Sequence, residues 1–211
     1  MNFITNPEEI ERKSFDIIAE KLEGRQFDPQ CLSVIKRVIH TTADFDYADN
    51  LVFSEGAIMI ARVALKDRAQ IVTDTQMAKA GINKKALEQL GCSVHCFIDA
   101  PEAAEIAQAA GTTRARAAVD LAIQTLNGPV IFAVGNAPTA LIRLHELISS
   151  GAFSPKMIIA APVGFVNVVE SKELILNINV PCIVAKGQKG GSNVAAAICN
   201  ALLYGITKEM Q

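Results

Sequence analysis

His40 is the residue whose type and position best suit acid–base chemistry. It follows an amphipathic helical pattern and opens a polar segment, 40–46, that we expect to be a loop with hydroxyls and carboxylates. An imidazole titrates near neutral pH, so a histidine at this position can act as a general acid. The position also suits a solvated histidine at a helix end, where the helix dipole stabilises its charge.

Glycine-bearing segments follow three predicted strands, and each segment could hold an anion. Backbone N–H groups at the start of a helix bind anions, and nearby lysines such as Lys186 and Lys189 would add positive charge. Turns of α/β proteins also need glycine for structural reasons, so spacing alone leaves anion binding and simple turn formation equally open. The candidate binding residues of these segments are Gly135, Asn136, Gly164, Lys186, Gly190, Gly191 and Ser192.

Arg114 and Arg116 open an alanine-rich helical pattern and could bind carboxylates through paired hydrogen bonds. The alternative is a capped helix with two solvated arginines. The chain has no G-x-x-x-x-G-K-[ST] and no G-x-G-x-x-G after a strand, so both nucleotide-binding signatures are missing. His95 lies between Cys92 and Cys96 but would point away from both in a strand, so we predict no metal site.

The composition excludes several classes of protein. The chain has 211 residues, of which 50% are hydrophobic, and a net charge of −2, which indicates a folded chain with a substantial core. A basic run and tryptophan are both absent, which argues against nucleic-acid binding. No apolar stretch has the length of a membrane span, and the N-terminus does not resemble a signal peptide. The 5 cysteines lack disulfide-framework spacing, which favours the cytoplasm.

Short apolar runs flanked by glycine and proline predict strands that are buried on both faces, as in a parallel sheet. Helical patterns lie between these runs, so we expect an α/β fold: an open, mostly parallel sheet with helices on both faces. Ligands of such sheets bind beyond the carboxyl ends of the strands, where the glycine-bearing segments lie. The predicted strands are 70–73, 94–98, 130–134, 157–160 and 182–185.

A helical segment precedes this sheet. Asn6, Pro7 and Glu9 form a helix-start signature, and Gly24 is a stop signal, so one helix should run from Pro7 to about Gly24. A second helix begins after Asp28. Because no Pro-, Gly- or Ser-rich linker follows, we expect a single domain over 1–211, with a helical part at about 7–45 and an α/β part at about 50–208.

Several motifs, taken in order, make the chain resemble the precorrin-8X methylmutase family, also called cobalt-precorrin-8 methylmutase. Each motif by itself is moderate evidence for the family. The order and spacing of all of them, over nearly the whole chain, are specific evidence. The motifs are 11–15 (ERKSF), 38–40 (VIH), 74–77 (DTQM), 111–114 (GTTR), 135–141 (GNAPTAL), 162–166 (PVGFV) with 170–172 (ESK), and 190–192 (GGS).

The resemblance implies an isomerase of cobalamin biosynthesis. Members move a methyl group from C-11 to C-12 of a ring-contracted tetrapyrrole, which gives hydrogenobyrinic acid or its cobalt counterpart, cobyrinic acid. It also implies a homodimer whose substrate sites involve both subunits, with no cofactor. The composition had already argued against nucleic acid and membrane as partners.

The resemblance also implies roles for individual residues. His40 matches the family histidine that protonates the macrocycle, and Ser14 and Arg114 match substrate contacts. Asn83 stands near a third contact, where the family usually has threonine. The substrate carries acetate and propionate arms, and Arg114 together with the glycine-bearing segments would supply anion sites around the ring.

Two other functions stay open at this point. A non-catalytic corrinoid carrier would use the same carboxylate-binding motifs, and only turnover distinguishes it from an enzyme. An unrelated nucleotide-binding α/β protein is disfavoured by the missing phosphate-loop signatures. The sequence does not decide whether the substrate already holds cobalt, although its general similarity favours the cobalt form.

Overall fold

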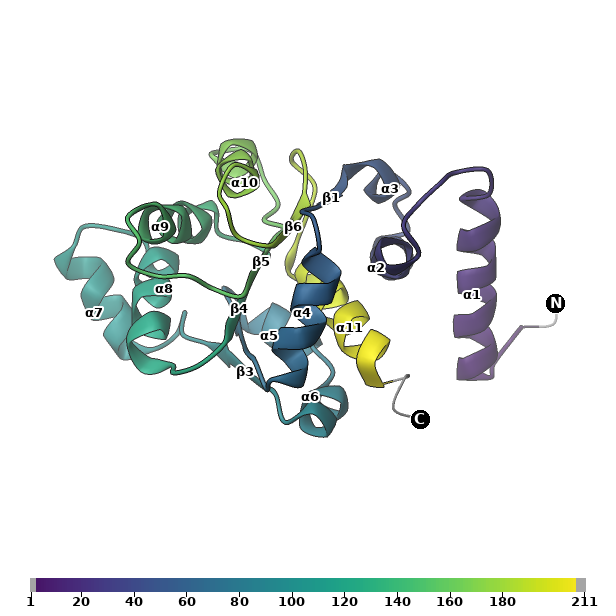
Figure 1. The fold of residues 1–211 in the computed structure, drawn as a ribbon, viewed down its shortest axis with the longest axis horizontal. Coiled ribbons are helices and arrows are strands. Elements are labelled where there is room, and N and C mark those ends of the chain that lie inside the picture. The colour runs from purple at the N-terminus through teal and green to yellow at the C-terminus, as the bar shows by residue number, and fades with distance from the viewer. Residues whose placement is uncertain (1–2, 208–211) are drawn as a thin grey trace.

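The computed structural model describes residues 3–207 and has an α/β architecture. Figure 1 shows a sheet through the middle of the molecule with helices on both sides. In chain order the elements are α1 (Pro7–Lys21), α2 (Pro29–Thr42), α3 (Tyr47–Asn50), β1 (Leu51–Phe53), α4 (Ala57–Lys66), β2 (Gln70–Thr73), α5 (Gln76–Gly81), α6 (Lys84–Leu90), β3 (Ser93–Cys96), α7 (Pro101–Ala109), α8 (Arg114–Thr125), β4 (Val130–Val134), α9 (Pro138–Ser149), β5 (Met157–Ala160), α10 (Val168–Leu176), β6 (Cys182–Ala185) and α11 (Ser192–Thr207).

The strand order of the sheet is β1-β6-β5-β4-β2-β3. Five strands are parallel to their neighbours, and only β1 runs antiparallel, against β6. The prediction of an open, mostly parallel sheet with helices on both faces is confirmed. The edge strand β1 was not predicted, because three residues are too few to show a periodic pattern.

The central strands are apolar throughout because they are buried on both faces. Successive side chains point to opposite faces, so Ile131 and Ile159 pack with α2, α4 and α11, while Phe132 and Ile158 pack with α8, α9 and α10. Two separate cores result, one on each face. In Figure 1, α7 to α10 cover one face, and α2, α4, α5, α6 and α11 lie on the other.

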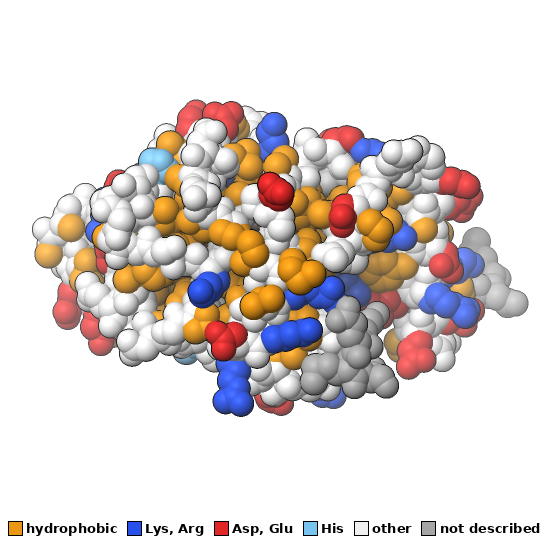
Figure 2. Space-filling view, in the orientation of Figure 1, with side chains coloured by type: hydrophobic (Ala, Val, Ile, Leu, Met, Phe, Trp, Pro, Cys, Tyr) orange, Lys and Arg blue, Asp and Glu red, His pale blue; other side chains and the backbone are white. Residues whose placement is uncertain are grey.

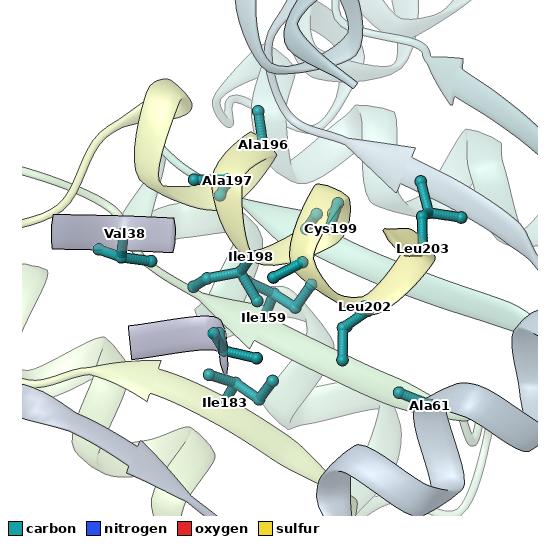
Figure 3. Close-up of a cluster of buried hydrophobic side chains, with 14 of the residues drawn as sticks. Val38, Ala61, Ile159, Ile183, Ala196, Ala197, Ile198, Cys199, Leu202 and Leu203 are labelled. Carbon is teal, nitrogen blue, oxygen red and sulfur yellow. The ribbon is translucent and has the colours of Figure 1, made fainter. Parts of the chain in front are cut away.

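Helix α11 fills the middle of the first core. Apolar side chains cover most of its circumference, and Ile198, Cys199 and Leu203 are fully or almost fully buried. Figure 3 shows the Ile198 side chain among Val38 of α2 and Ile159 and Ile183 of the sheet, while Leu203 points away from α2. A helix that is hydrophobic all round is a core helix, and α11 therefore joins the sheet to the N-terminal helices.

The two N-terminal helices begin where their capping residues predict. The Asn6 side chain accepts the Glu9 N–H at the start of α1, and the Asp28 carboxylate accepts two N–H groups at the start of α2. The expectation of a loop from His40 was wrong at its start. Helix α2 continues to Thr42 and ends where Ala43 takes a left-handed conformation, with φ at 55°.

Candidate active site

His40 lies in the last turn of α2 with an exposed side chain. Its imidazole stacks on the Phe15 ring of α1, with ring centroids 5.0 Å apart and an interplanar angle of 12°. One face of the imidazole is therefore held by an apolar ring, while the side chain still reaches solvent. This arrangement suits a group that must exchange a proton with a bound molecule.

Arg37 connects the Phe15–His40 pair to α11. Its guanidinium lies 4.7 Å from the centroid of the Phe15 ring and 5.1 Å from that of Tyr204. The same guanidinium donates to the Glu11 carboxylate at 2.8 Å, which fixes its direction. Arg37, on α2, thus contacts both α1 and α11 next to the stacked Phe15–His40 pair.

Asn83 reaches the same group of side chains from another element. Its amide nitrogen donates to the Tyr204 hydroxyl at 2.9 Å, and its amide oxygen caps α6 by accepting the Ala86 N–H. The structure thus connects Asn83 to His40 through Tyr204, Arg37 and Phe15. Both polar groups of the Asn83 side chain thus have a partner in the protein.

A pocket of about 470 Å³ opens between α1, α2 and α11 beside this network. We call it the helical pocket. Phe15, Arg37 and Tyr204 belong both to its wall and to the network, so the pocket lies next to the stacked histidine. The complete lining is Glu8, Glu11, Arg12, Phe15, Ser33, Lys36, Arg37, Ala201, Tyr204 and Gly205.

The loop after β4 does not offer free N–H groups. The buried Asp74 carboxylate, at the end of β2, accepts the N–H groups of Gly135, Asn136 and Ala137 at 2.7–2.8 Å. Burial raises the pKa of the Asp74 carboxyl, and these donors oppose that rise because they favour its ionised form. These three N–H groups therefore already have an anionic partner within the protein.

Gly135 and Gly190 are required in these loops by close backbone approach. A Cβ on Gly190 would lie 2.2 Å from the Ala161 carbonyl oxygen, and one on Gly135 would lie 2.7 Å from the Ser192 Cα. The loops after β4, β5 and β6 therefore pack directly against one another at the carboxyl edge of the sheet. The Gly191 N–H donates to Ala161, which joins two of these loops.

The start of α11 is also tied to β2. The Ser192 and Thr75 hydroxyls lie 2.7 Å apart and share a hydrogen bond, and Thr75 also caps α5 by accepting the Ala78 N–H. Asp74 and Thr75 were part of a recognised motif without an assigned task. In the structure these two residues bind the neighbouring loops together.

Lys172 holds the loop after β6. This lysine is only 1% exposed, and its ammonium donates to the Gly187 and Lys189 carbonyl oxygens at 2.7 and 2.8 Å. Burial lowers the pKa of Lys172 to about 8. The sequence showed this residue only as part of a motif, because nothing in its neighbours indicated that a lysine would be buried.

Lys189 does not add free positive charge to the edge of the sheet. Its ammonium pairs with the Asp44 and Asp46 carboxylates at 2.6 Å each. The ion pair lowers the pKa of Asp44 and connects the segment after His40 to the β6 loop. Lys186 is exposed in the same loop.

Arg114 and Arg116 differ in their surroundings. Arg116 forms a double hydrogen bond with the Glu146 carboxylate on α9, so its guanidinium is already occupied by a structural partner. Arg114 is exposed at the start of α8. Helix α8 packs on the opposite face of the sheet from α2, so Arg114 and His40 lie on different sides of the carboxyl edge.

Ser14 lies next to Phe15 on α1 and is half-buried. Its hydroxyl donates to the Ile10 carbonyl oxygen at 2.8 Å, which leaves the hydroxyl oxygen able to accept. Gly164 lies in the β5 loop, where its N–H donates to Gln188. Ser14 thus directly precedes Phe15, the residue that stacks on His40, while Gly164 belongs to the group of packed loops.

Within residues 3–207 no group of three His, Cys, Asp or Glu side chains could hold a metal ion. His95, half-buried, contacts the Ser93 hydroxyl at 2.8 Å and stacks on Phe97. No helix in the described part of the chain combines the length and apolar character needed to cross a membrane.

Known proteins resemble this chain over nearly its whole length. A family model described as precorrin-8X methylmutase matches residues 9–205. The chain belongs to the precorrin-8X methylmutase family. It is accordingly an isomerase, a methylmutase of cobalamin biosynthesis. The cobalt-precorrin-8 methylmutase of Salmonella typhimurium is 46% identical over 211 residues, with 97% of this chain and 98% of that protein covered.

Other members of the methylmutase family show the same similarity in sequence and in fold. The precorrin-8X methylmutase of Pseudomonas aeruginosa is 36% identical, with 96% of this chain and 97% of that protein covered. A crystal structure of precorrin-8X methylmutase from Thermus thermophilus superposes with a TM-score of 0.85 at 40% identity, covering 93% of this chain and 94% of the other.

Proposed function

We propose that this chain moves a methyl group from C-11 to C-12 of precorrin-8X or its cobalt form, with His40 as the ring-protonating acid. The observation that carries the assignment of the acid is the exposed His40 imidazole, stacked on Phe15 beside the helical pocket. Hydrogenobyrinic acid or cobyrinic acid would be the product.

The reaction needs a proton donor and acceptor rather than a nucleophile. The His40 imidazolium gives a proton to the conjugated ring, which makes the ring electron-poor. The methyl group then migrates within the substrate, so one carbon–carbon bond breaks and another forms. The proton returns to the imidazole, and the enzyme ends in its starting state.

The substrate would lie across the carboxyl edge of the sheet. Ser14 stands next to the Phe15–His40 pair, whereas Arg114 lies on the other side of the edge. A substrate that contacts both Ser14 and Arg114 must either span the packed loops or lie between two subunits. A large planar ring with carboxylate arms meets the first requirement, and it would cross the loops after β4, β5 and β6, which carry Asn136, Gly164 and Lys186.

We propose a homodimer that contributes residues of both subunits to each site. The loop after β5 supports this, because Phe165 and Val166 are 81% and 78% exposed there. Met59 and Val63 expose further apolar area on α4, and Figure 2 shows apolar side chains gathered over the middle of that face. Equilibrium sedimentation measures the oligomeric state, and a monomer at working concentration would contradict the dimer.

A single-turnover assay with the precursor tests the enzymatic function. Wild-type protein should convert the precursor to the corrin, and His40→Ala should bind it with near-normal affinity but lower turnover by about 10²–10⁴-fold. His145→Ala, on α9, is the matched control and should keep full turnover. Normal turnover of His40→Ala would refute the assigned role. Binding without turnover by the wild type would favour the corrinoid carrier instead.

We also propose the cobalt-containing substrate and a cytoplasmic location. Relatives named cobalt-precorrin-8 methylmutase from Salmonella typhimurium and Priestia megaterium are 46% and 40% identical, against 36% for the Pseudomonas aeruginosa precorrin-8X methylmutase. All five cysteines are free thiols, which suits a reducing compartment. Parallel titrations with cobyrinic and hydrogenobyrinic acid, followed by visible absorption, would distinguish the two metal states.

A further inference from the structure

We propose that the helical pocket binds a carboxylate-bearing arm of the substrate, with Arg12 and Lys36 as its cationic contacts. This inference rests on the proposed function, because it takes the ligand to be a ring with acetate and propionate arms. It adds a subsite and two binding residues: Arg12 lies in the 11–15 motif but has no role assigned from the resemblance, and Lys36 lies outside the motifs.

The position of the helical pocket supports this subsite. Phe15 lines the pocket and also stacks on His40, so a ligand held at His40 meets the pocket mouth at Phe15. On α2 the side chains of Ser33, Lys36, Arg37 and His40 follow at helical spacing and lie along one side of the helix. An arm that leaves the ring near His40 can therefore run along α2 into the pocket.

The charges that line the helical pocket suit a carboxylate. Arg37 is paired with Glu11, whereas Arg12 and Lys36 have no ion-pair partner within residues 3–207. Glu8 is the other carboxylate in the lining, and it stands in the first turn of α1, where the helix dipole stabilises it. Two cations and one carboxylate of the lining therefore have no ion-pair partner in the described part of the chain, and an anionic arm would supply a partner for the cations.

The size and the apolar walls of the pocket also fit an arm rather than the whole ring. Pockets for small ligands have volumes of about 300–1,000 Å³, and 470 Å³ lies at the lower end. Phe15, Tyr204 and Ala201 supply apolar surface for the methylene groups of the arm. Arg12 and Lys36 then meet the terminal carboxylate, as charge-assisted hydrogen bonds require.

The subsite should affect binding and leave the chemical step unchanged. The arm is remote from the migrating methyl group, so its contacts are the same in the ground state and the transition state. Loss of such uniform binding raises KM and leaves kcat unaltered. Substitution of Arg12 or Lys36 should therefore raise KM, whereas substitution of His40 should lower kcat.

The test is a titration of the folded protein with hydrogenobyrinic acid at low and high salt, followed by single-turnover kinetics on the precursor. Arg12→Gln and Lys36→Gln should each raise Kd by about three- to tenfold, because each removes a partly exposed charged contact. Lys66→Gln, at the exposed end of α4, is the matched control and should bind like the wild type. High salt should reduce the difference between wild type and variants, since it screens these charges.

The outcomes distinguish the subsite from the function. If the wild type binds and converts substrate while both variants match Lys66→Gln, the subsite is wrong and the methylmutase function stands. If either variant lowers kcat with an unchanged KM, the arm-binding role is also wrong. If the wild type neither binds hydrogenobyrinic acid nor converts the precursor, the proposed function itself fails.

Discussion

The Phe15 ring of α1 lies nearly parallel to the His40 imidazole of α2, with centroids 5.0 Å apart and planes 12° apart. The two helices are thereby joined at the residue that we propose as the acid. Because Arg37 also lies over the Phe15 ring, the imidazole plane is held by α1 and α2 together. The direction in which His40 offers its proton thus depends on a neighbour without any acid–base chemistry of its own.

Phe15→Leu should lower kcat by up to about tenfold, because a stacked aromatic pair contributes about 0.5–1.5 kcal/mol. KM should change little, because leucine keeps apolar surface in the wall of the helical pocket and the proposed contacts on Ser14 and Arg114 are untouched. Phe15→Tyr keeps the ring and should restore most of kcat. Single-turnover rates of the two variants measure the effect, and an unchanged kcat in Phe15→Leu would show that the stack does not position His40.

Asp74→Asn should lower the free energy of unfolding by about 2–4 kcal/mol, because an amide cannot accept three N–H groups and its own NH₂ would face them. The donors concerned are those of 135–137. Urea unfolding measures the change. Asp67→Asn, an exposed residue after α4, is the control and should stay within about 0.5 kcal/mol of the wild type. Equal midpoints for the two variants would contradict the role of Asp74.

Gly190→Ala should be destabilising by about 2 kcal/mol or more, because its Cβ would lie 2.2 Å from the Ala161 carbonyl oxygen. Gly205→Ala is the matched comparison. Its Cβ would meet only Arg62 at 3.6 Å, and alanine favours a helix over glycine by about 1 kcal/mol. Thermal melting should therefore shift in opposite directions for the two variants. A neutral Gly190→Ala would show that the loops can move apart.

Lys172 should make the free energy of unfolding rise between pH 8 and 10.5. Its pKa is about 8 when folded, against the ordinary 10.5, so the unfolded chain binds more protons in this range. The rise amounts to about 3 kcal/mol, since each pKa unit corresponds to about 1.4 kcal/mol. Below pH 8 the lysine is charged in both states, and its burial penalty is fully present.

Lys172→Met is the variant that isolates this effect. Other groups titrate equally in both proteins, so the difference between wild type and variant should grow with pH across this window. Urea unfolding at pH 7.5, 9 and 10.5 measures it. Parallel pH profiles for the two proteins would mean that Lys172 does not change its protonation in the folded state.

Much of the fold follows from local patterns in the sequence. The strands β4, β5 and β6 were predicted at their observed bounds, because continuous apolar runs between glycine and proline are typical of buried parallel strands. The starts of α1 and α2 were equally clear from Asn6 and Asp28. Local signals failed for β1, which is short, and for the end of α2, where polar residues continue the helix.

The residue types and motifs of the sequence by themselves determined the α/β class, the family resemblance and the choice of His40. Only the tertiary structure decided what the polar residues do. Asp74 accepts hydrogen bonds from N–H groups that could otherwise have bound an anion, and Lys189 forms ion pairs with two aspartates. Such pairings join residues that are 61 or more positions apart, so no local pattern encodes them. The stack of Phe15 on His40 is of the same kind, because it exists only once α1 packs on α2.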